Sequence, residues 1–280
     1  MQLHLLGTGT PILDPARPAS SAFLVDVAGA TLLFDAGRGV TMQLLKLGRS
    51  PVAIDYLFIT HHHYDHICDL GELLMAAWHN GRTSPLQVYG PAGTRGIVKA
   101  LLDGVFARDI AFARVTEPEG PNIHDLIQVT DITAPWHLAT DAFQIRAAYV
   151  NHGNSLGLSV ADWPCLGYRL EAVGRVLAVG GDAVACEGLS ELAEGADTLL
   201  LSCYLAESEV VGLGFELLAE HVIASAGMCG QIAADAGVAT LILTHFRRKS
   251  AELMAELAQD VAHRFGGKLI LGCDLQLIEI

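Results

Sequence analysis

The feature that most constrains this 280-residue chain is a run of potential metal ligands, HHHYDH, at positions 61–66. The apolar run Tyr56–Thr60 comes directly before it and predicts a β-strand that ends at the first histidine. Side chains two residues apart in an extended segment point the same way, so His61 and His63 can bind one metal ion while His62 points elsewhere. The run therefore predicts a metal site at the end of a strand.

Asp65 and His66 complete the run, at the point where the chain turns toward a predicted helix. They can reach a second metal ion beside the first. Imidazole and carboxylate groups form a ligand set suited to zinc, with manganese or iron as alternatives. We therefore expect two divalent metal ions as cofactors, zinc before the other two. A surface histidine run without a role is the alternative, which the fixed spacing and the preceding strand disfavour.

The rest of the chain predicts a mixed α/β fold built in layers. Short runs rich in Val, Ile and Leu alternate with glycine-containing turns and longer helical stretches, and no low-complexity linker divides the 280 residues. The segments at 31–39 (TLLFDAGRG) and 175–183 (RVLAVGGDA) each lead from a strand into a turn with glycine and aspartate. Two similar halves would make a sandwich of sheets with helices outside. The segment at about 103–141 is expected to be an irregular flap.

The charge balance bears on the partner. The chain has 17 Lys and Arg against 31 Asp and Glu, a formal net charge of −14. Such a field disfavours a polyanion, so we expect a small-molecule substrate and consider nucleic acid unlikely.

The composition also indicates where the protein works. No apolar run approaches the ~18 residues of a membrane span, and the N-terminus lacks the pattern of a signal peptide. The six cysteines include no C-x-x-C pair, which favours reduced thiols. We expect a cytoplasmic protein without a membrane partner.

The pattern H-x-H-x-D-H at positions 61–66 resembles the metallo-β-lactamase superfamily. Four further motifs occur in the order expected for its ribonuclease Z and arylsulfatase-like branch: LGTGTP at 6–11, FDAGRG at 34–39, GGDA at 180–183 and LTHF at 243–246. The resemblance implies a four-layer αββα sandwich over residues 1–280 in a single domain, a metal-dependent hydrolase activity and a homodimer.

The resemblance also implies three more ligands. His152 would complete the first metal site, His245 would complete the second, and Asp182 would bridge the two metals. The full implied set of ligands is His61, His63, Asp65, His66, His152, Asp182 and His245. Asp35, in the turn that resembles the Asp182 turn, is expected to support a neighbour rather than to bind metal.

Two residues are candidates for the catalytic chemistry. Two close dications bring the pKa of a bridging water to about neutral, so hydroxide becomes available as the nucleophile. Asp65 would orient that hydroxide, and His221 is the candidate proton donor to the leaving group. Ribonuclease Z relatives carry Ser-Thr after the corresponding histidine and a glutamate in a His-Glu-Ala-Thr motif, whereas this chain reads EHVIAS at 220–225 and SCYLAE at 202–207. His221 is therefore either this donor or a helix-start histidine without a role.

The leading prediction is a dinuclear hydrolase of a small ester-like substrate: a sulfate ester, a phosphodiester or a lactone, with hydrolytic dehalogenation also conceivable. A transfer-RNA 3′-processing endonuclease is the first alternative, disfavoured by the acidic charge, the missing glutamate and the lack of a basic arm rich in Gly and Pro. A non-catalytic metal-bound sensor is the second alternative.

One motif points to a different chemistry. GNSLG at 153–157 matches the G-x-S-x-G pattern of serine hydrolases, with Ser155 as nucleophile. That pattern needs a helix directly after the serine, but the residues that follow contain Pro164 and alternate as strand and turn do. The sequence therefore disfavours a serine hydrolase.

Overall fold

Two β-hairpins, each followed by parallel strands, organise the structure, a computed structural model that describes all 280 residues. The strands form two seven-stranded sheets, with the orders β14-β1-β2-β3-β4-β5-β6 and β13-β12-β11-β10-β9-β8-β7, so the last strand of the chain joins the first sheet. The strands are β1 (Gln2–Gly7), β2 (Ala22–Val27), β3 (Ala30–Phe34), β4 (Tyr56–Phe58), β5 (Leu86–Pro91), β6 (Ile127–Ile132), β7 (Trp136–Ala139), β8 (Gln144–Tyr149), β9 (Leu166–Ala172), β10 (Arg175–Gly181), β11 (Thr198–Ser202), β12 (Thr240–Thr244), β13 (Lys268–Leu271) and β14 (Gln276–Glu279).

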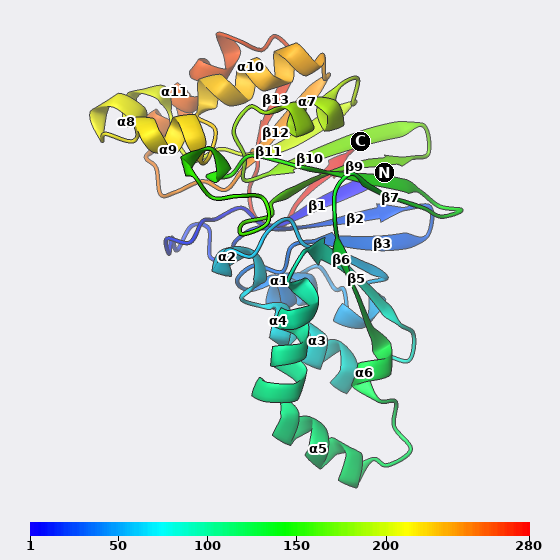
Figure 1. Cartoon of the computed structure of the whole chain (residues 1–280). Helices are drawn as coiled ribbons and strands as arrows, with labels where there is room; N and C mark the ends of the chain where they lie inside the picture. Colours follow the sequence, from blue (N-terminus) through cyan, green and yellow to red (C-terminus); the bar gives the residue numbers. More distant parts are fainter.

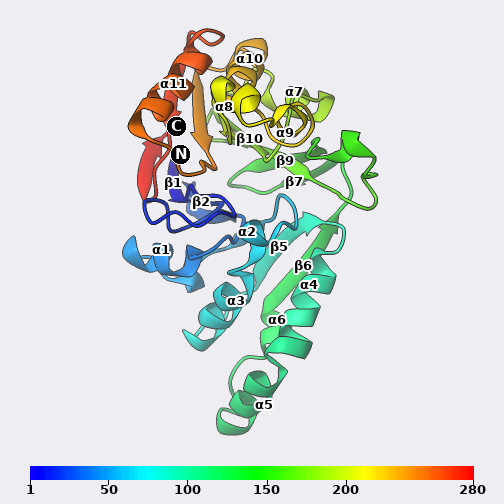
Figure 2. The same ribbon diagram turned by 90° about the vertical axis from the view of Figure 1, so that its left-hand side faces the viewer.

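The helices lie on the outer faces of the two sheets (Figures 1 and 2). They are α1 (Val40–Lys46), α2 (Tyr64–Ile67), α3 (Leu70–His79), α4 (Thr94–Ala100), α5 (Ala107–Thr116), α6 (Ile123–Leu126), α7 (Glu187–Ala193), α8 (Glu207–Gly212), α9 (Glu216–His221), α10 (Ala226–Ala236) and α11 (Ala251–Ala262). Short 3₁₀ turns at Pro51–Ala53 and Asn154–Leu156 and a π-helical turn at Leu101–Val105 complete the list.

The two halves repeat one another, as the similar segments at 31–39 and 175–183 predict. Strand β3 pairs antiparallel with β2 and parallel with β4. Strand β10 likewise pairs antiparallel with β9 and parallel with β11. Both strands take the fourth place in their sheets. Each therefore delivers the turn that follows it to the same edge of the sandwich.

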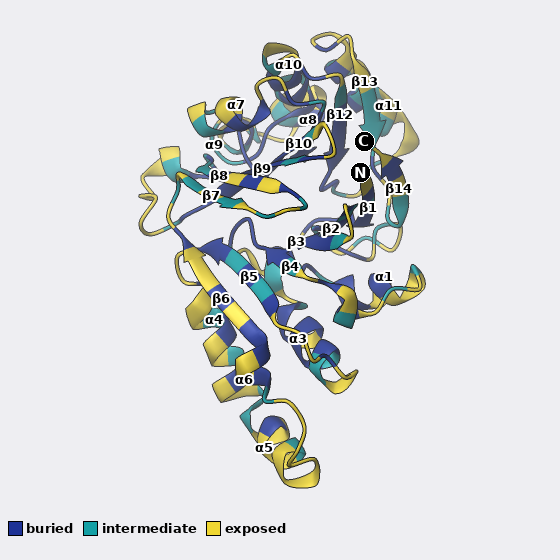
Figure 3. Cartoon of the chain, turned by 90° about the vertical axis from the view of Figure 1, so that its right-hand side faces the viewer, coloured by how far each residue is buried: buried dark blue, intermediate teal, exposed yellow.

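Three clusters of buried apolar side chains lie between the four layers of the structure. Between the sheets lies a buried cluster that includes Phe34, Phe58 and Tyr168. A second cluster packs the first sheet against helices such as α3, and a third packs the other sheet against α7, α10 and α11. The strands of both sheets are mostly buried, while the outer helices expose one face (Figure 3). This confirms the predicted αββα sandwich.

The segment 103–141 differs from its prediction, since most of it has regular structure. It contains α5, α6, β6 and β7, and β6 extends the first sheet by pairing parallel with β5. Helix α5 projects from the body of the molecule (Figure 2), and Ile110 is its only buried residue. A helix that buries so little apolar surface has no amphipathic pattern, which explains why the sequence did not reveal it.

No helix has the length and apolar character that crossing a membrane would require.

Candidate metal centre

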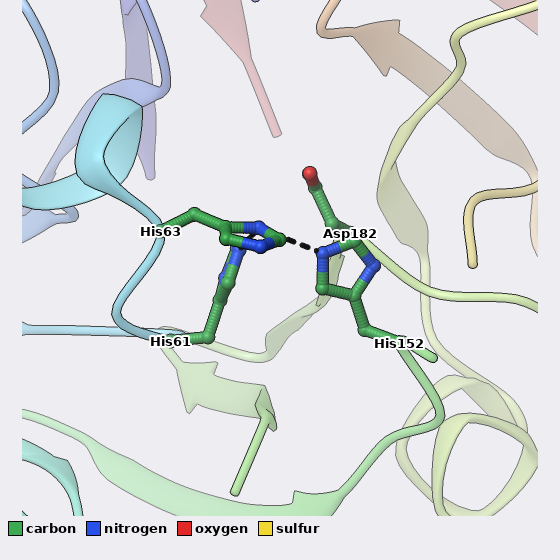
Figure 4. Close-up of side chains that lie close together, drawn as sticks. All are labelled: His61, His63, His152 and Asp182. Atoms are coloured by element: carbon green, nitrogen blue, oxygen red, sulfur yellow. Dashed lines mark hydrogen bonds between the residues drawn. The ribbon is translucent and has the colours of Figure 1, made fainter. Parts of the chain in front are cut away.

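The first group of potential ligands lies at one edge of the sandwich. His61 and His63 follow β4, His152 follows β8 and Asp182 follows β10, and their ligand atoms all lie within 4.8 Å of one another. His63 Nδ1 is 3.0 Å from both His61 Nε2 and His152 Nε2. Figure 4 shows the three rings and the carboxylate pointing toward one another. The chain thus gathers three imidazoles and one carboxylate from three separate segments.

The second group lies beside the first and consists of Asp65, His66 and His245, again within 4.8 Å. His245 Nε2 is 3.2 Å from Asp65 Oδ2. Asp182 Oδ2 is 3.5 Å from His66 Nε2 and 3.3 Å from His245 Nε2. The Asp182 carboxylate therefore lies between the two groups and can belong to both.

Hydrogen bonds fix how several of the imidazoles are oriented. His152 Nδ1 is 2.6 Å from the Val222 carbonyl oxygen, to which it donates. His61 Nδ1 lies 3.0 Å from the Thr60 hydroxyl oxygen. Because the Nδ1 atom of each ring has this outer partner, the Nε2 lone pair is left facing the centre.

Asp35 holds the second group in place. Its carboxylate accepts hydrogen bonds from the Thr60 backbone N–H at 2.7 Å and the Thr60 hydroxyl at 2.8 Å. The same carboxylate lies 2.8 Å from His66 Nδ1. Asp35 itself has a positive φ of 59°, a strained conformation for a residue other than glycine. It supports His66, as the sequence predicted, and does not face the centre.

Replacing Asp35 with asparagine should weaken metal binding about 10- to 100-fold, because the carboxylate that orients His66 is lost. Asparagine tolerates the left-handed backbone, so the turn should survive. Competition with a chromophoric chelator measures the affinity. Asp26→Asn, which removes a carboxylate from β2 away from the centre, should bind as the wild type does. Equal affinity in Asp35→Asn would contradict this role.

Burial keeps three of the histidines neutral. It lowers the pKa of His61 well below the usual value, lowers that of His63 to about 4, and lowers that of His152. Repulsion from neighbouring imidazoles adds to this effect. Neutral imidazole is the form that binds metal, so these side chains need not release a proton near pH 7.

His66 and Asp182 behave in the opposite way. Burial alone would lower the pKa of His66, but the carboxylates of Asp182 and Asp35 raise it well above the usual range. The positive field of His245 and His66 holds the pKa of Asp182 far below its usual value, although burial opposes this. Both pKa shifts thus reflect the attraction between the His66 ring and the carboxylates that face it.

The donor set fits a pair of divalent cations. His66 Nε2 and Asp182 Oδ1 are buried and have no hydrogen-bond partner within the chain. Such orphaned atoms are costly unless something else binds them. Two cations between the groups would satisfy both atoms with imidazole and carboxylate ligands, the chemistry that zinc accepts.

A cavity of about 180 Å³ opens over both groups. Tyr204, which follows β11, is one wall of this cavity. Leu218, Val222 and Ile223 from α9 and the following turn are further walls that sequence reasoning missed. Their positions depend on how α9 folds back over the sheet edge, which no local pattern encodes.

Trp163 also escaped the sequence analysis. Its indole N–H donates to the His152 carbonyl oxygen at 3.0 Å, and its ring lies 4.7 Å from that of His63. The Trp therefore fixes the loop that carries His152. The only available signal was a tryptophan shortly after that histidine.

His221 lies beside the cavity, although it is not among the residues that line it. Its Nδ1 is 3.0 Å from the Ser155 hydroxyl oxygen, and its carbonyl accepts from Gly153 N–H at 2.8 Å. Ser155 sits in a 3₁₀ turn rather than on an elbow before a helix, and Asp182 belongs to the ligand groups. These residues do not form a serine-hydrolase triad.

The fold is that of the metallo-β-lactamase class of hydrolases, and two groups of potential metal ligands lie at one edge of it. The β-lactamase superfamily domain model matches residues 30–246. Ribonuclease Z from Mycobacterium marinum is 32% identical over 100% of this chain and 99% of that protein. Ribonuclease Z from Mycobacterium avium is also 32% identical, over 100% and 98%. The chain belongs to the metallo-β-lactamase superfamily and, within it, to the ribonuclease Z branch.

Solved structures agree on the fold. The short form of human tRNase Z superposes with a TM-score of 0.73 at 22% identity, covering 100% of this chain and 99% of that one. The metallo-β-lactamase fold protein YhfI from Bacillus subtilis gives a TM-score of 0.73 at 18% identity, covering 99% and 98%.

These relatives contradict the prediction that the substrate is a small molecule and that nucleic acid is an unlikely partner. The full-length relatives are named ribonucleases, and the human structure is named a tRNase. The prediction relied on the net charge of the whole chain, but binding depends on the local field. Asp35, Asp65 and Asp182 are buried among histidines, so these acidic charges contribute little to the outer surface.

Proposed function

We propose that this protein is a zinc-dependent endonuclease that hydrolyses a phosphodiester bond at the 3′ end of precursor transfer RNA. One observation carries the proposal. A chain similar over its full length to ribonuclease Z enzymes has two groups of potential metal ligands, with Asp182 between them, under one cavity. The finer assignments below are part of this proposal.

The ligand groups would hold two zinc ions, with Asp182 as the bridge. When bound, the ions supply an acidified water and an electrophilic clamp on the phosphate oxygens. Asp65 lines the cavity and is held by the His245 ring at 3.2 Å. Its carboxylate orients the attacking water and accepts its proton.

The leaving group in RNA hydrolysis is a ribose oxygen, which is a poor leaving group without a proton. His221 would provide that proton from the edge of the cavity. The Ser155 hydroxyl fixes the ring through Nδ1. Val222, the next residue, lines the cavity, which puts His221 at its edge.

His221→Ala should lower kcat for RNA cleavage by about 10²- to 10⁴-fold, the usual contribution of a positioned general acid. Hydrolysis of a bis-nitrophenyl phosphodiester should change little, because nitrophenolate leaves without a proton. Steady-state kinetics on both substrates make the comparison, with the surface variant His124→Ala as control. An equal loss on both substrates would rule out the donor role.

The proposed function is tested with a precursor transfer RNA that carries a 3′ trailer. Zinc-loaded protein should cut it at one site, and His63→Ala should not. Metal analysis of the same preparations establishes the number and identity of the ions. The proposal fails if intact, metal-loaded protein leaves the precursor uncut but hydrolyses a lactone or a sulfate ester.

A further inference from the structure

Arg247 has an environment unlike that of the other buried or half-buried arginines. Its Cζ lies 5.8 Å from the centre of the Tyr204 ring and 5.6 Å from the centre of the Phe215 ring. Tyr204 follows β11 and Phe215 precedes α9, so the two rings come from either end of α8. We call Arg247, Tyr204 and Phe215 the aromatic clamp. Two aromatic faces hold one guanidinium in a fixed plane.

The guanidinium makes no hydrogen bond within the chain. Its nearest acidic partner is Glu209, with Nε 3.6 Å from Oε1, although the side chain is only 28% exposed. Other arginines with limited exposure are bonded: Arg82 and Arg169 donate to backbone carbonyl oxygens. A guanidinium carries five N–H donors. Arg247 is therefore oriented by aromatic rings while its donors stay available for an anion.

Glu209 forms a long ion pair with Arg247 through Oε1, but its hydrogen bonds go to other partners. Its Oε2 accepts from the Ala206 backbone N–H at 2.9 Å and pairs with Lys249, whose side chain is only 1% exposed. The Lys249 ammonium also donates to the Tyr204 carbonyl oxygen at 2.9 Å. Lys249 and Glu209 thus hold the clamp in place, and the Lys249 side chain is too buried to contact a substrate.

The clamp borders the proposed catalytic cavity. Tyr204 lines that cavity, and its ring centre lies 6.2 Å from that of His245. Arg247 is two residues beyond His245, on the segment that follows β12. An anion bound by Arg247 would therefore be a neighbour of the group that reacts at the metal centre.

We infer that the aromatic clamp is a substrate subsite in which Arg247 binds the phosphate next to the scissile one in a single-stranded RNA. A planar guanidinium binds two phosphate oxygens at once, and the flanking rings offer stacking faces to an unpaired base. This inference rests on the proposed function, because the RNA substrate is the one named there.

The test uses zinc-loaded full-length protein and the substrate precursor transfer RNA. Arg247→Gln should lower kcat/KM about 10- to 100-fold, mainly through KM, since one charge-assisted contact is lost. The slope of log(kcat/KM) against log salt should become shallower by about 0.7, the value for one phosphate contact on a single strand. Turnover of a bis-nitrophenyl phosphodiester, which has no flanking phosphate, should fall much less than RNA cleavage.

Two matched variants separate the subsite from general effects of charge and folding. Arg248→Gln removes the exposed neighbouring charge and should change kcat/KM and the salt slope much less. Arg247→Lys keeps the charge but not the planar fork, and should recover only part of the loss. Thermal melting of each variant shows that the fold is intact.

A substrate whose flanking phosphate is replaced by a neutral methylphosphonate makes the test specific. The methylphosphonate should lower kcat/KM of the wild type by the same factor as Arg247→Gln does. It should not lower kcat/KM of the Arg247→Gln variant any further. Unchanged RNA kinetics in Arg247→Gln, or equal losses in Arg247→Gln and Arg248→Gln, would overturn the inference.

A failure of the proposed function would look different. If the wild type leaves RNA intact, the precursor becomes a binding probe, measured by fluorescence anisotropy. Lower affinity in Arg247→Gln but not in Arg248→Gln would then support the phosphate subsite without the endonuclease. Equal affinities would overturn it.

Discussion

Asp182→Ala should reduce kcat/KM on any substrate by at least about 10³-fold and should release metal from both ligand groups. The bridging geometry is the reason, since Asp182 Oδ2 lies 3.5 Å from His66 Nε2 and 3.3 Å from His245 Nε2 while the residue also belongs to the first group. A fall of this size in kcat/KM corresponds to the loss of several kcal/mol of transition-state stabilisation.

His63→Ala should inactivate the protein as strongly but should vacate only the first group. The two variants therefore differ in metal content more than in rate. Metal analysis after gel filtration, together with kinetics, measures both effects. His124→Ala, at an exposed position of α6, should keep full metal and full activity. If Asp182→Ala kept one full equivalent of metal, the bridging role would be wrong.

Lys249→Met should destabilise the fold by about 3 kcal/mol, because removing one partner of a buried ion pair leaves the other charge uncompensated. The side chains of Lys249 and Glu209 are 1% and 7% exposed. Urea denaturation, with metal held constant, gives the free energy of unfolding. Since the pair also fixes Tyr204 and α8, kcat/KM should fall as well.

A double-mutant cycle identifies the cause of that loss. Glu209→Gln combined with Lys249→Met should cost clearly less than the sum of the two single changes, because the double variant buries no unpaired charge. The exposed pair of Lys99 and Asp103 is the control, and Lys99→Met should change stability by less than about 1 kcal/mol. Additive losses in the buried pair would show that packing, rather than charge, explains the effect.

The strand and run at 56–66 were predictable because their geometry is local. Alternation in an extended segment places His61 and His63 on one side, and the following turn starts α2 with Asp65 and His66 in its first residues. The repeated turns at 31–39 and 175–183 likewise predicted the two equivalent sheets. In both cases neighbours in the sequence carry the information.

The remaining residues of the centre required the resemblance or the structure. His245 meets Asp65 across 180 residues, and His152 meets His63 across 89. No periodicity relates positions so far apart, because the parallel strands β10, β11 and β12 bring them to one edge only after the sheet forms. For His221, the catalytic role stays a prediction.

By itself, then, the sequence determined the ligand-bearing strand end, the αββα layering and the hydrolytic class. Only the tertiary structure decided which acidic side chains are buried and which side chains wall the cavity. The net charge of −14 is a sum over all positions, whereas recognition depends on a few groups held at a distance from one another. The placement of Arg247 between Tyr204 and Phe215 arises only when β12 and the ends of α8 meet. Long-range packing creates that arrangement, and local pattern cannot encode it.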